Sequence, residues 1–259
     1  MAYKQIKVDK KQGIGIITIN RPKVLNALND ATIKEIISSI DDLEQDENIK
    51  SVVFTGEGKA FIAGADISQM ANMTPLEAKK FSELGHSMLD KIEQSRLIFI
   101  AAVNGFALGG GCETVAAMDI VIASKKAVFG QPEINLGISP GFGGTQRLAR
   151  IVGRMKAKEL LLTGRNVTAE EAYQIGLANK VVDENELMEQ AEKIAGKIAS
   201  KSAVQTQFIK ELVNKGIEVD LKTGNALEIS YFSSSFSTYD QKEGMKAFLE
   251  KRKPTFEDK

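Results

Sequence analysis

Two glutamates stand alone in long uncharged stretches of this sequence. Glu113 is the only formally charged residue in segment 97–118, and Glu133 is the only one in segment 127–146. A carboxylate that enters apolar surroundings loses hydration worth several kcal/mol unless it is paired or protonated. Two such groups in one pocket could act as a general acid and a general base, if the fold brings them together.

Glycines near the first glutamate suggest a second chemical function. Residues 109–111 are all glycine and lead into a predicted helix that contains Glu113. Backbone N–H groups at such a helix start are approachable and can stabilise a developing oxyanion. A second turn of small residues, 61–67 (FIAGADI), could supply another N–H from Ala65. The structural alternatives are a first-turn acid that interacts with the helix dipole and glycines that allow close helix packing.

Several other signatures do not hold. Segment 137–141 (GISPG) matches the G-x-S-x-G elbow of hydrolases, but Pro140 has no N–H for an oxyanion hole. Segment 141–146 (GFGGTQ) lacks the final glycine of the dinucleotide-binding fingerprint. One cysteine, Cys112, and one histidine, His86, exclude a disulfide and a Cys/His metal cluster. A metal site made of carboxylates alone stays open, but no EF-hand spacing supports one, and we expect no metal.

Strands and helices alternate over the first 200 residues. Short β-branched runs predict strands, at 13–20, 49–56, 97–105, 119–124 and 179–183. Apolar residues at helical spacing predict a helix around Ile33, Ile36, Ile37, Ile40 and Leu43, and another over about 75–92. This alternation predicts an α/β fold.

The strand signal stops near residue 200. Three successive helices are predicted after that point, at 204–215, 221–236 and 240–251. We therefore divide the chain into a core with the active site, 1–199, and a helical oligomerisation region, 200–259.

Composition limits the classes of partner. Lys plus Arg and Asp plus Glu both number 34, so no net charge attracts the chain to nucleic acid or anionic lipid. No stretch approaches the ~20 apolar residues that span a bilayer, and the N-terminus has no signal-peptide core. We expect a soluble cytoplasmic protein that binds neither nucleic acid nor membrane.

Five segments together resemble one family, the crotonases or enoyl-CoA hydratases. They are 20–28 (NRPKVLNAL), 63–67 (AGADI), 101–113 (AAVNGFALGGGCE), 129–133 (FGQPE) and 140–148 (PGFGGTQRL). In order and spacing they cover nearly the whole chain. The resemblance implies a crotonase-like spiral of ββα units, a C-terminal helical trimerisation region, and a homo-oligomer, a hexamer built as a dimer of trimers.

The resemblance also assigns roles at the reacting atoms. The thioester carbonyl of an acyl-CoA would lie between the N–H groups of Ala65 and Gly110. Glu113 would act on the water and Glu133 on C2, while Gly141 would help to set Glu133 and the water. No cofactor is implied, because coenzyme A is part of the substrate.

Further positions would bind coenzyme A. Lys23 would meet the phosphates, and the backbone of the 63–68 turn would meet the adenine end. The residues of that turn in this role are Ala63, Ala65, Asp66, Ile67 and Ser68. Phe248 and Lys251 resemble the pair that reaches a neighbouring subunit's coenzyme.

The complete glutamate pair favours hydration over double-bond migration. Among family members the chain is most similar to 3-hydroxybutyryl-CoA dehydratases, although Thr114 and Met118 depart from their pattern. An isomerase on the same fold, a noncatalytic RNA-binding relative and a purely structural oligomer are the alternatives. Candidates for the acyl-pocket wall are Met70, Met73, Leu84 and Met88, although long apolar side chains at helical spacing are more often core residues.

Overall fold

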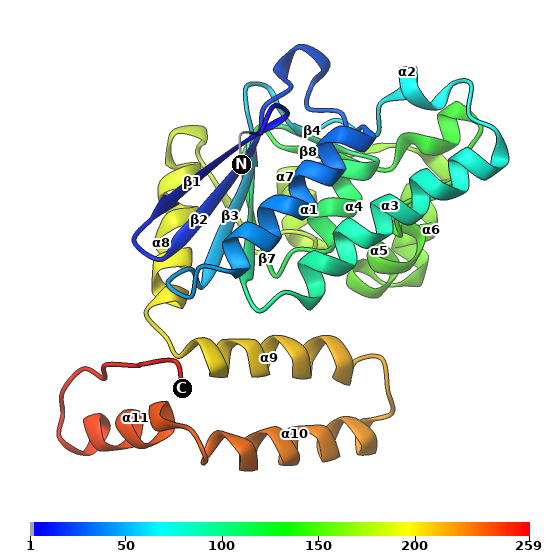
Figure 1. Ribbon diagram of the computed structural model, residues 1–259. Coiled ribbons are helices and arrows are strands. Elements are labelled where there is room, and N and C mark those ends of the chain that lie inside the picture. Colours follow the sequence, from blue (N-terminus) through cyan, green and yellow to red (C-terminus); the bar gives the residue numbers. More distant parts are fainter. Residues whose placement is uncertain (1–2) are drawn as a thin grey trace.

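The computed structural model describes residues 3–259, a body of two sheets with three helices beneath it (Figure 1). The larger sheet has the order β1 (Ile6–Lys11), β2 (Ile14–Ile19), β3 (Ser51–Gly56), β5 (Ile98–Val103), β7 (Ile120–Ser124), β10 (Lys180–Val182). The smaller sheet has the order β4 (Ala60–Ile62), β6 (Phe106–Leu108), β8 (Val128–Gly130), β9 (Asn166–Thr168).

Successive chain segments contribute one strand to each sheet. β3 is followed by β4, β5 by β6, and β7 by β8, and within each sheet these neighbours pair in parallel. Each turn of the spiral therefore repeats the previous turn, displaced by the distance between two neighbouring strands. This arrangement confirms the predicted α/β spiral of ββα units.

Helices cover the sheets and fill the turns of the spiral. Within the body they are α1 (Asp30–Glu44), α2 (Ile67–Met70), α3 (Pro75–Gln94), α4 (Gly110–Ala116), α5 (Gly144–Val152), α6 (Arg154–Thr163), α7 (Ala169–Gln174), α8 (Leu187–Ala199), and the 3-10 turns η1 (Pro22–Val24), η2 (Pro132–Leu136) and η3 (Glu184–Glu186). In α1 the predicted apolar face is buried, except that Ile37 is half-buried.

Local sequence explains where the first long helices begin. The Asn29 side chain accepts the Thr32 N–H at the start of α1. At α3, Thr74 and Glu77 form a capping box, and Pro75 occupies the first turn. These caps satisfy backbone donors that the helix itself leaves unpaired.

The longer predicted strands are present, while the prediction missed β1 and every strand of the smaller sheet. β2, β3, β5, β7 and β10 lie within or close to the predicted ranges. Each strand of the smaller sheet has three residues, too few to show a period of two.

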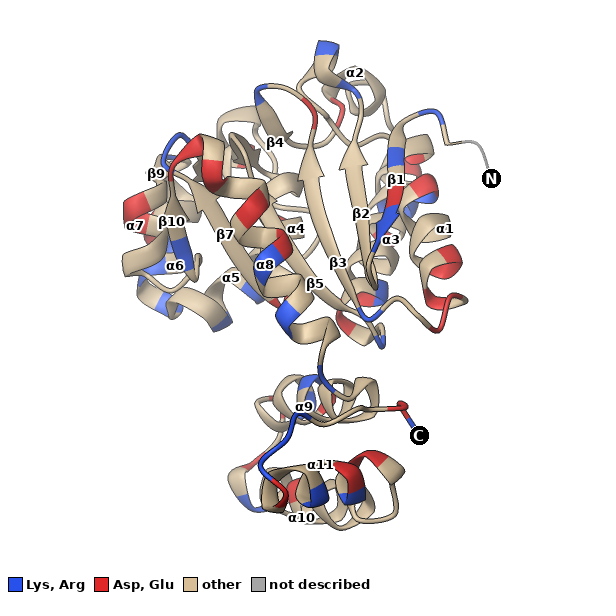
Figure 2. Cartoon of the chain, turned by 90° about the vertical axis from the view of Figure 1, so that its left-hand side faces the viewer, with Lys and Arg blue, Asp and Glu red and all other residues tan. Residues whose placement is uncertain are grey.

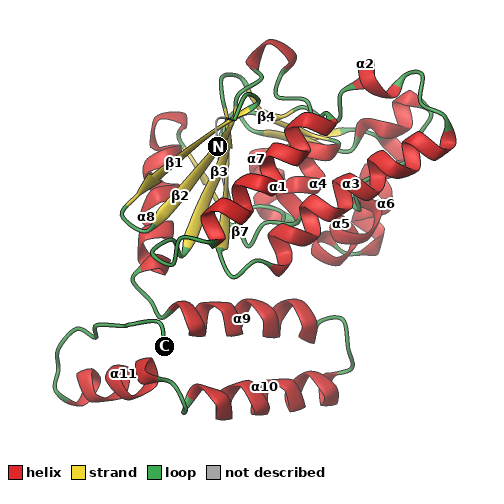
Figure 3. Cartoon of the chain, viewed as in Figure 1, coloured by secondary structure: helices red, strands yellow, loops and turns green. Residues whose placement is uncertain are grey.

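Three helices complete the chain: α9 (Ala203–Gly216), α10 (Leu221–Ser235) and α11 (Tyr239–Leu249). They agree with the predicted helices to within about two residues. Figure 2 and Figure 3 show, from two sides, α9 beneath the body, with α10 and α11 on its far side. None of the helices in residues 3–259 combines the length and apolar character that a bilayer crossing would require.

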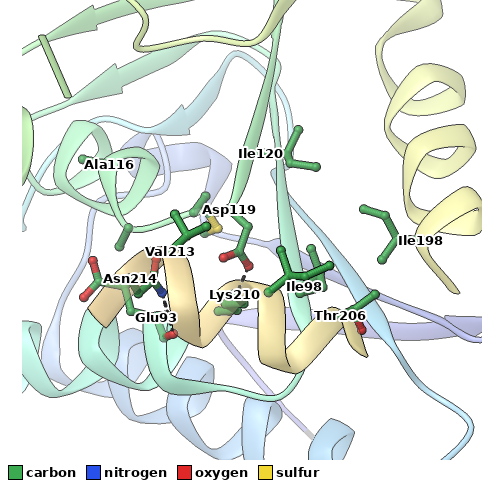
Figure 4. A pocket seen from close by; sticks show the side chains of 13 residues that line it. Glu93, Ile98, Ala116, Asp119, Ile120, Ile198, Thr206, Lys210, Val213 and Asn214 are labelled. Carbon is green, nitrogen blue, oxygen red and sulfur yellow. Dashed lines mark hydrogen bonds and ion pairs between the residues drawn. The ribbon is translucent and has the colours of Figure 1, made fainter. Parts of the chain in front are cut away.

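The joint between α9 and the body contains a buried ion pair. Lys210 donates to Asp119 Oδ2 at 2.8 Å and to the carbonyls of Ile92 and Leu97 at 2.8 and 2.9 Å. Figure 4 shows the pocket beside this pair, which includes Ile98 of β5. All three ammonium protons therefore have acceptors, and the pair fastens α9 to the larger sheet.

Candidate active site

Three of the predicted site residues follow the carboxyl ends of neighbouring strands in the smaller sheet. Ala65 follows β4, Gly110 follows β6 and Glu133 follows β8. Because β4, β6 and β8 are parallel and adjacent, their carboxyl ends meet at one edge of the sheet. The spiral therefore brings together residues that lie far apart in the sequence.

Gly109 lies at the centre of this edge. Its φ of 49° and ψ of −120° are tolerated by glycine alone. A Cβ at this position would lie 2.8 Å from Glu133 Oε1 and 3.6 Å from the Cα of Gly64. The start of α4, the Ala65 turn and the Glu133 carboxylate are thus in mutual contact range.

The N–H groups of Ala65 and Gly110 are the candidate oxyanion donors. Gly110 is the first residue of α4, where N–H groups have no intrahelical acceptor. Around Ala65, the Leu28 N–H donates to the Gly64 carbonyl at 2.9 Å, and the Asp66 N–H donates to the Leu28 carbonyl at 2.7 Å. These bonds fix the turn through the carbonyl before Ala65 and the N–H after it, and they do not use the N–H of Ala65 itself.

Glu113 lies one turn into α4 and is 2% exposed. Its Oε1 accepts the N–H of Phe142 at 2.8 Å and the N–H of Gly144 at 2.7 Å. No residue in 3–259 donates a hydrogen bond to Oε2. One carboxylate oxygen is therefore anchored, and the other can face a reacting molecule.

Glu133 lies in η2 and is 9% exposed. With the amide nitrogen of Gln131 turned toward it, that side chain donates to Oε1 and Oε2 at 3.0 and 3.2 Å. A Cβ on Gly144 would lie 2.8 and 2.9 Å from the two polar atoms of the Gln131 amide. Gln131 therefore links Glu133 to the loop that binds Glu113.

Burial is the main reason that both carboxyl groups hold protons more tightly than usual. It raises the pKa of Glu113 to about 7, with the charge of Glu133 adding to the rise and the two N–H bonds opposing it. Burial also raises the pKa of Glu133. Two neighbouring carboxyl groups whose pKa values are both raised can provide one base and one acid together.

Cys112, beside Glu113, takes no comparable role. Burial raises the pKa of its thiol to about 12, so the nucleophilic thiolate does not form near neutral pH. Among residues 3–259, no three His, Cys, Asp or Glu side chains gather where they could hold a metal ion.

The segment predicted to bind coenzyme A borders this edge. The Ala63 N–H donates to the Leu25 carbonyl at 3.0 Å, which joins the 63–68 turn to the end of η1. Arg21 pairs with Asp66 at 3.1 Å in the same region. Lys23 is exposed on η1, the element that the Ala63–Leu25 bond joins to the turn.

The remaining two residues of the turn begin α2. Ile67 and Ser68 are exposed, and the Asp66 side chain caps the helix by accepting the N–H and the hydroxyl of Ser68 at 3.2 and 2.6 Å. Both residues thus lie in the first turn after Ala65.

Some predicted positions do not join the site within one chain. Phe248 is 83% exposed on α11, and Lys251 follows that helix, on the far side of α9 from the two sheets (Figure 1). Met88 is fully buried in the hydrophobic core, whereas Met70, Met73 and Leu84 are half-buried against it. Of the acyl-wall candidates, Met88 therefore behaves as a core residue.

Gly141 is exposed, and the loop that it begins binds Glu113. Sequence reasoning linked this glycine to Glu133 and gave no role to Gln131 or Arg147. Both residues lie inside segments used for the resemblance, but neither has the isolated charge that drew attention to the glutamates.

Comparison with known proteins finds similar sequences over nearly the full chain. The sequence model described as enoyl-CoA hydratase/isomerase matches residues 9–259. A short-chain-enoyl-CoA hydratase of Clostridium acetobutylicum is 49% identical, over 98% of this chain and 97% of its own. A crotonyl-CoA hydratase of Syntrophomonas wolfei is 47% identical, over 99% of both chains.

Solved structures give the same result. An enoyl-CoA hydratase from Bacillus anthracis has a TM-score of 0.96 at 38% identity and covers 99% of this chain and 100% of its own. A second relative, from Geobacillus kaustophilus, has a TM-score of 0.95 at 41% identity over 99% of both chains.

Proposed function

Because the chain belongs to the enoyl-CoA hydratase/isomerase family, we propose that it adds water reversibly across the C2–C3 bond of short-chain trans-2-enoyl-CoA thioesters. It is then a hydro-lyase. The observation that carries the proposal is the meeting, around Gly109, of two buried glutamates with the N–H groups of Ala65 and Gly110.

The thioester carbonyl is held by the two N–H groups. Its oxygen accepts from Ala65 and Gly110, and the positive end of α4 adds to the second contact. This polarisation makes C3 electrophilic and stabilises the enolate charge that develops on the oxygen.

The glutamates move the protons. Ionised Glu113 takes a proton from water as the water oxygen bonds to C3, and protonated Glu133 delivers a proton to C2. The adduct gains one water in total, and the two carboxyl groups have exchanged their protonation states. Dehydration is the same sequence in reverse.

The substrate assignment rests on the relatives. The names of the two relatives specify short-chain enoyl-CoA and crotonyl-CoA hydration. We therefore assign crotonyl-CoA as a substrate, with dehydration of 3-hydroxybutyryl-CoA as the reverse reaction. This chemistry fits a place in butyrate or fatty acid metabolism, and the single, reduced Cys112 suits the cytoplasm.

We propose that the chain acts as a homo-oligomer, a hexamer of two trimers. Large apolar side chains are exposed on the C-terminal helices, including Ile209, Ile229, Phe232 and Phe248. Monomers rarely leave so many uncovered together. Phe248 and Lys251 then reach the coenzyme of a neighbouring chain. Sedimentation should give the mass of six chains, and a monomer would contradict this.

Turnover of crotonyl-CoA tests the proposed reaction. Purified protein should remove the enoyl thioester absorbance, and NMR should identify a 3-hydroxyacyl product rather than a shifted double bond. Glu113→Gln and Glu133→Gln should each slow turnover at least about 100-fold, the lower range of acid–base catalysis. Glu47→Gln, an exposed glutamate in a loop, is the control. Wild-type rates in both site variants would refute the assignment.

A further inference from the structure

The loop at residues 141–144 determines how Glu113 is held. Two of its N–H groups, from Phe142 and Gly144, donate to the same oxygen of Glu113 at 2.8 and 2.7 Å. Gly143 between them has a φ of 102°, a left-handed conformation that turns both N–H groups to one side. The position and charge of Glu113 therefore depend on the shape of this loop.

The carbonyls of the loop point toward α3 and α5 instead. Ser82 of α3 donates its hydroxyl to the Gly141 carbonyl at 2.5 Å. Arg147 of α5 donates to the Phe142 carbonyl at 3.2 Å. The carbonyls of the loop are thus bonded to α3 and α5, while two of its N–H groups are bonded to Glu113.

The Phe142 ring also packs against apolar residues of α3. It packs edge-on against Phe81, with ring centroids 5.2 Å apart. A Cβ on Gly85 would lie 2.3 Å from the same ring, so the glycine makes the space that the ring fills.

Arg147 is held firmly by acids of α3. Its guanidinium bonds Glu93 twice, at 2.8 and 2.6 Å, and Asp90 at 2.8 Å. Its side chain is 14% exposed. This fork geometry fixes the direction of the nitrogen that reaches Phe142.

Charged and titratable groups of α3 and η2 face Arg147, loop 141–144 and Glu113. From α3, Asp90 and Glu93 face Arg147, and His86 Cε1 would lie 3.2 Å from a Cβ on Gly143. From η2, the charge of Glu133 acts on Glu113. Arg147 is the cation that opposes Glu133 at Glu113.

We propose that Arg147 is a positioning residue for the hydration reaction, which locks loop 141–144 against α3 so that its N–H groups hold Glu113 ready to accept a proton. This inference rests on the proposed function and deepens it. Arg147 acts through Phe142 and Glu113, and it does not touch the reacting atoms.

Loss of Arg147 should act on Glu113 in a definite direction. The positive charge of Arg147 and the N–H bonds from Phe142 and Gly144 all lower the pKa of Glu113, against the larger effect of burial. Without Arg147 the pKa of Glu113 rises. Since Glu113 must be ionised to take a proton from water, the acid limb of the hydration pH profile moves to higher pH.

The test compares Arg147→Gln with the matched variant Arg150→Gln in hydration of crotonyl-CoA. Arg150 lies on the same helix and pairs with Glu218 at the surface. Arg147→Gln should lower kcat about 10- to 100-fold, as expected for a misplaced catalytic group, with KM within about threefold. Its acid limb should rise by about one pH unit. Arg150→Gln should match the wild type.

Three further results complete the test. Wild-type kcat and pH profile in Arg147→Gln, or a loss of kcat that is equal at every pH, would overturn the proposal. If Arg147→Gln does not fold, Arg147→Lys decides: it keeps the charge but cannot bond Glu93 twice, so a smaller loss of kcat with a smaller upward shift of the acid limb supports the proposal. Unchanged kinetics in that variant would overturn it.

Failure of the proposed function is distinguishable from failure of this inference. If wild-type protein does not hydrate crotonyl-CoA, the carboxyl of Glu113 can be titrated by NMR with 13C-labelled glutamate, using Glu113→Gln to assign its signal. A higher pKa in Arg147→Gln than in the wild type would still support the positioning role. An equal pKa would refute it.

Discussion

Two buried groups of charges in this protein are built in opposite ways. At the joint of α9, Asp119 is neutralised by Lys210 at 2.8 Å and also accepts the Phe99 N–H at 2.7 Å. At the sheet edge, Glu113 and Glu133 are both acids, and the groups that bond their side chains are N–H donors without charge. The charges of the first group cancel each other, whereas the two acids of the second group have no bonded cation.

This difference distinguishes a structural ion pair from a catalytic pair of acids. Burial raises the pKa of Asp119 and lowers that of Lys210, so burial outweighs the attraction between them, but each charge has its counter-charge bonded to it. Glu113 keeps a free oxygen and a pKa of about 7. A buried charge that is bonded to a counter-charge holds structure, while a buried carboxyl group without a counter-charge can exchange a proton.

Removing the cation of the joint should have the largest effect on stability. Lys210→Met leaves the Asp119 carboxylate buried without its partner, which should cost about 3–5 kcal/mol of unfolding free energy in urea titrations. Lys215→Met, on the exposed side of the same helix, is the control. In Lys210→Met/Asp119→Asn part of the loss should return, because the amide oxygen can still accept the Phe99 N–H. A loss of unfolding free energy below about 1 kcal/mol in Lys210→Met would show that the Lys210–Asp119 pair does not hold α9 to the body.

Removing an acid of the site should have the opposite sign. The folded pKa of Glu113, about 7, lies above its ordinary 4.5, so the folded state binds more protons than the unfolded state in this window. Its cost to stability is absent below pH 4.5, grows as pH rises and is complete above pH 7. Glu113→Gln should therefore be more stable than the wild type by roughly 3 kcal/mol at pH 8.

The pH dependence provides the check on that gain. At pH 5 the difference between Glu113→Gln and the wild type should be much smaller, since most of the wild-type carboxyl is then protonated in the folded state. Thermal or urea unfolding at both pH values measures it. A variant less stable than the wild type at pH 8 would mean that Glu113 is a structural acid.

A surface ion pair should have the smallest effect. Arg150 and Glu218 pair at 2.7 Å, but both side chains are about half exposed, 49% and 50%. Glu218→Gln should change the unfolding free energy by less than about 1 kcal/mol, and added salt should reduce even that. A loss as large as that of Lys210→Met would remove the distinction between exposed and buried pairs.

The sequence predicts the larger sheet and the helices better than the smaller sheet. Long β-branched runs such as β3 and β5 are buried on both faces, so their composition identifies them. β4, β6 and β8 have three residues each and are defined by pairing between distant segments, which no local pattern reports. The division of the chain at residue 199 stays a prediction, although α8 ends there.

The sequence likewise predicts only some of the residues of the candidate site. Glu113 and Glu133 can be found because isolated charge in an apolar segment is unusual, and Gly109 because a glycine run precedes a helix. Arg147 cannot be found in this way, since its part depends on Asp90 and Glu93, more than 50 residues earlier in the chain. Contacts of that kind are set by tertiary packing.

A double-variant cycle on crotonyl-CoA hydration tests most directly whether Glu113 and Glu133 work as one unit. The rates of Glu113→Gln, Glu133→Gln and the double variant are compared at one pH with the wild type. Groups that act on the same transition state are strongly non-additive, so the double variant should be no more than about tenfold slower than the slower single variant. Losses that multiply across the two sites, or a wild-type rate in either single variant, would contradict the account.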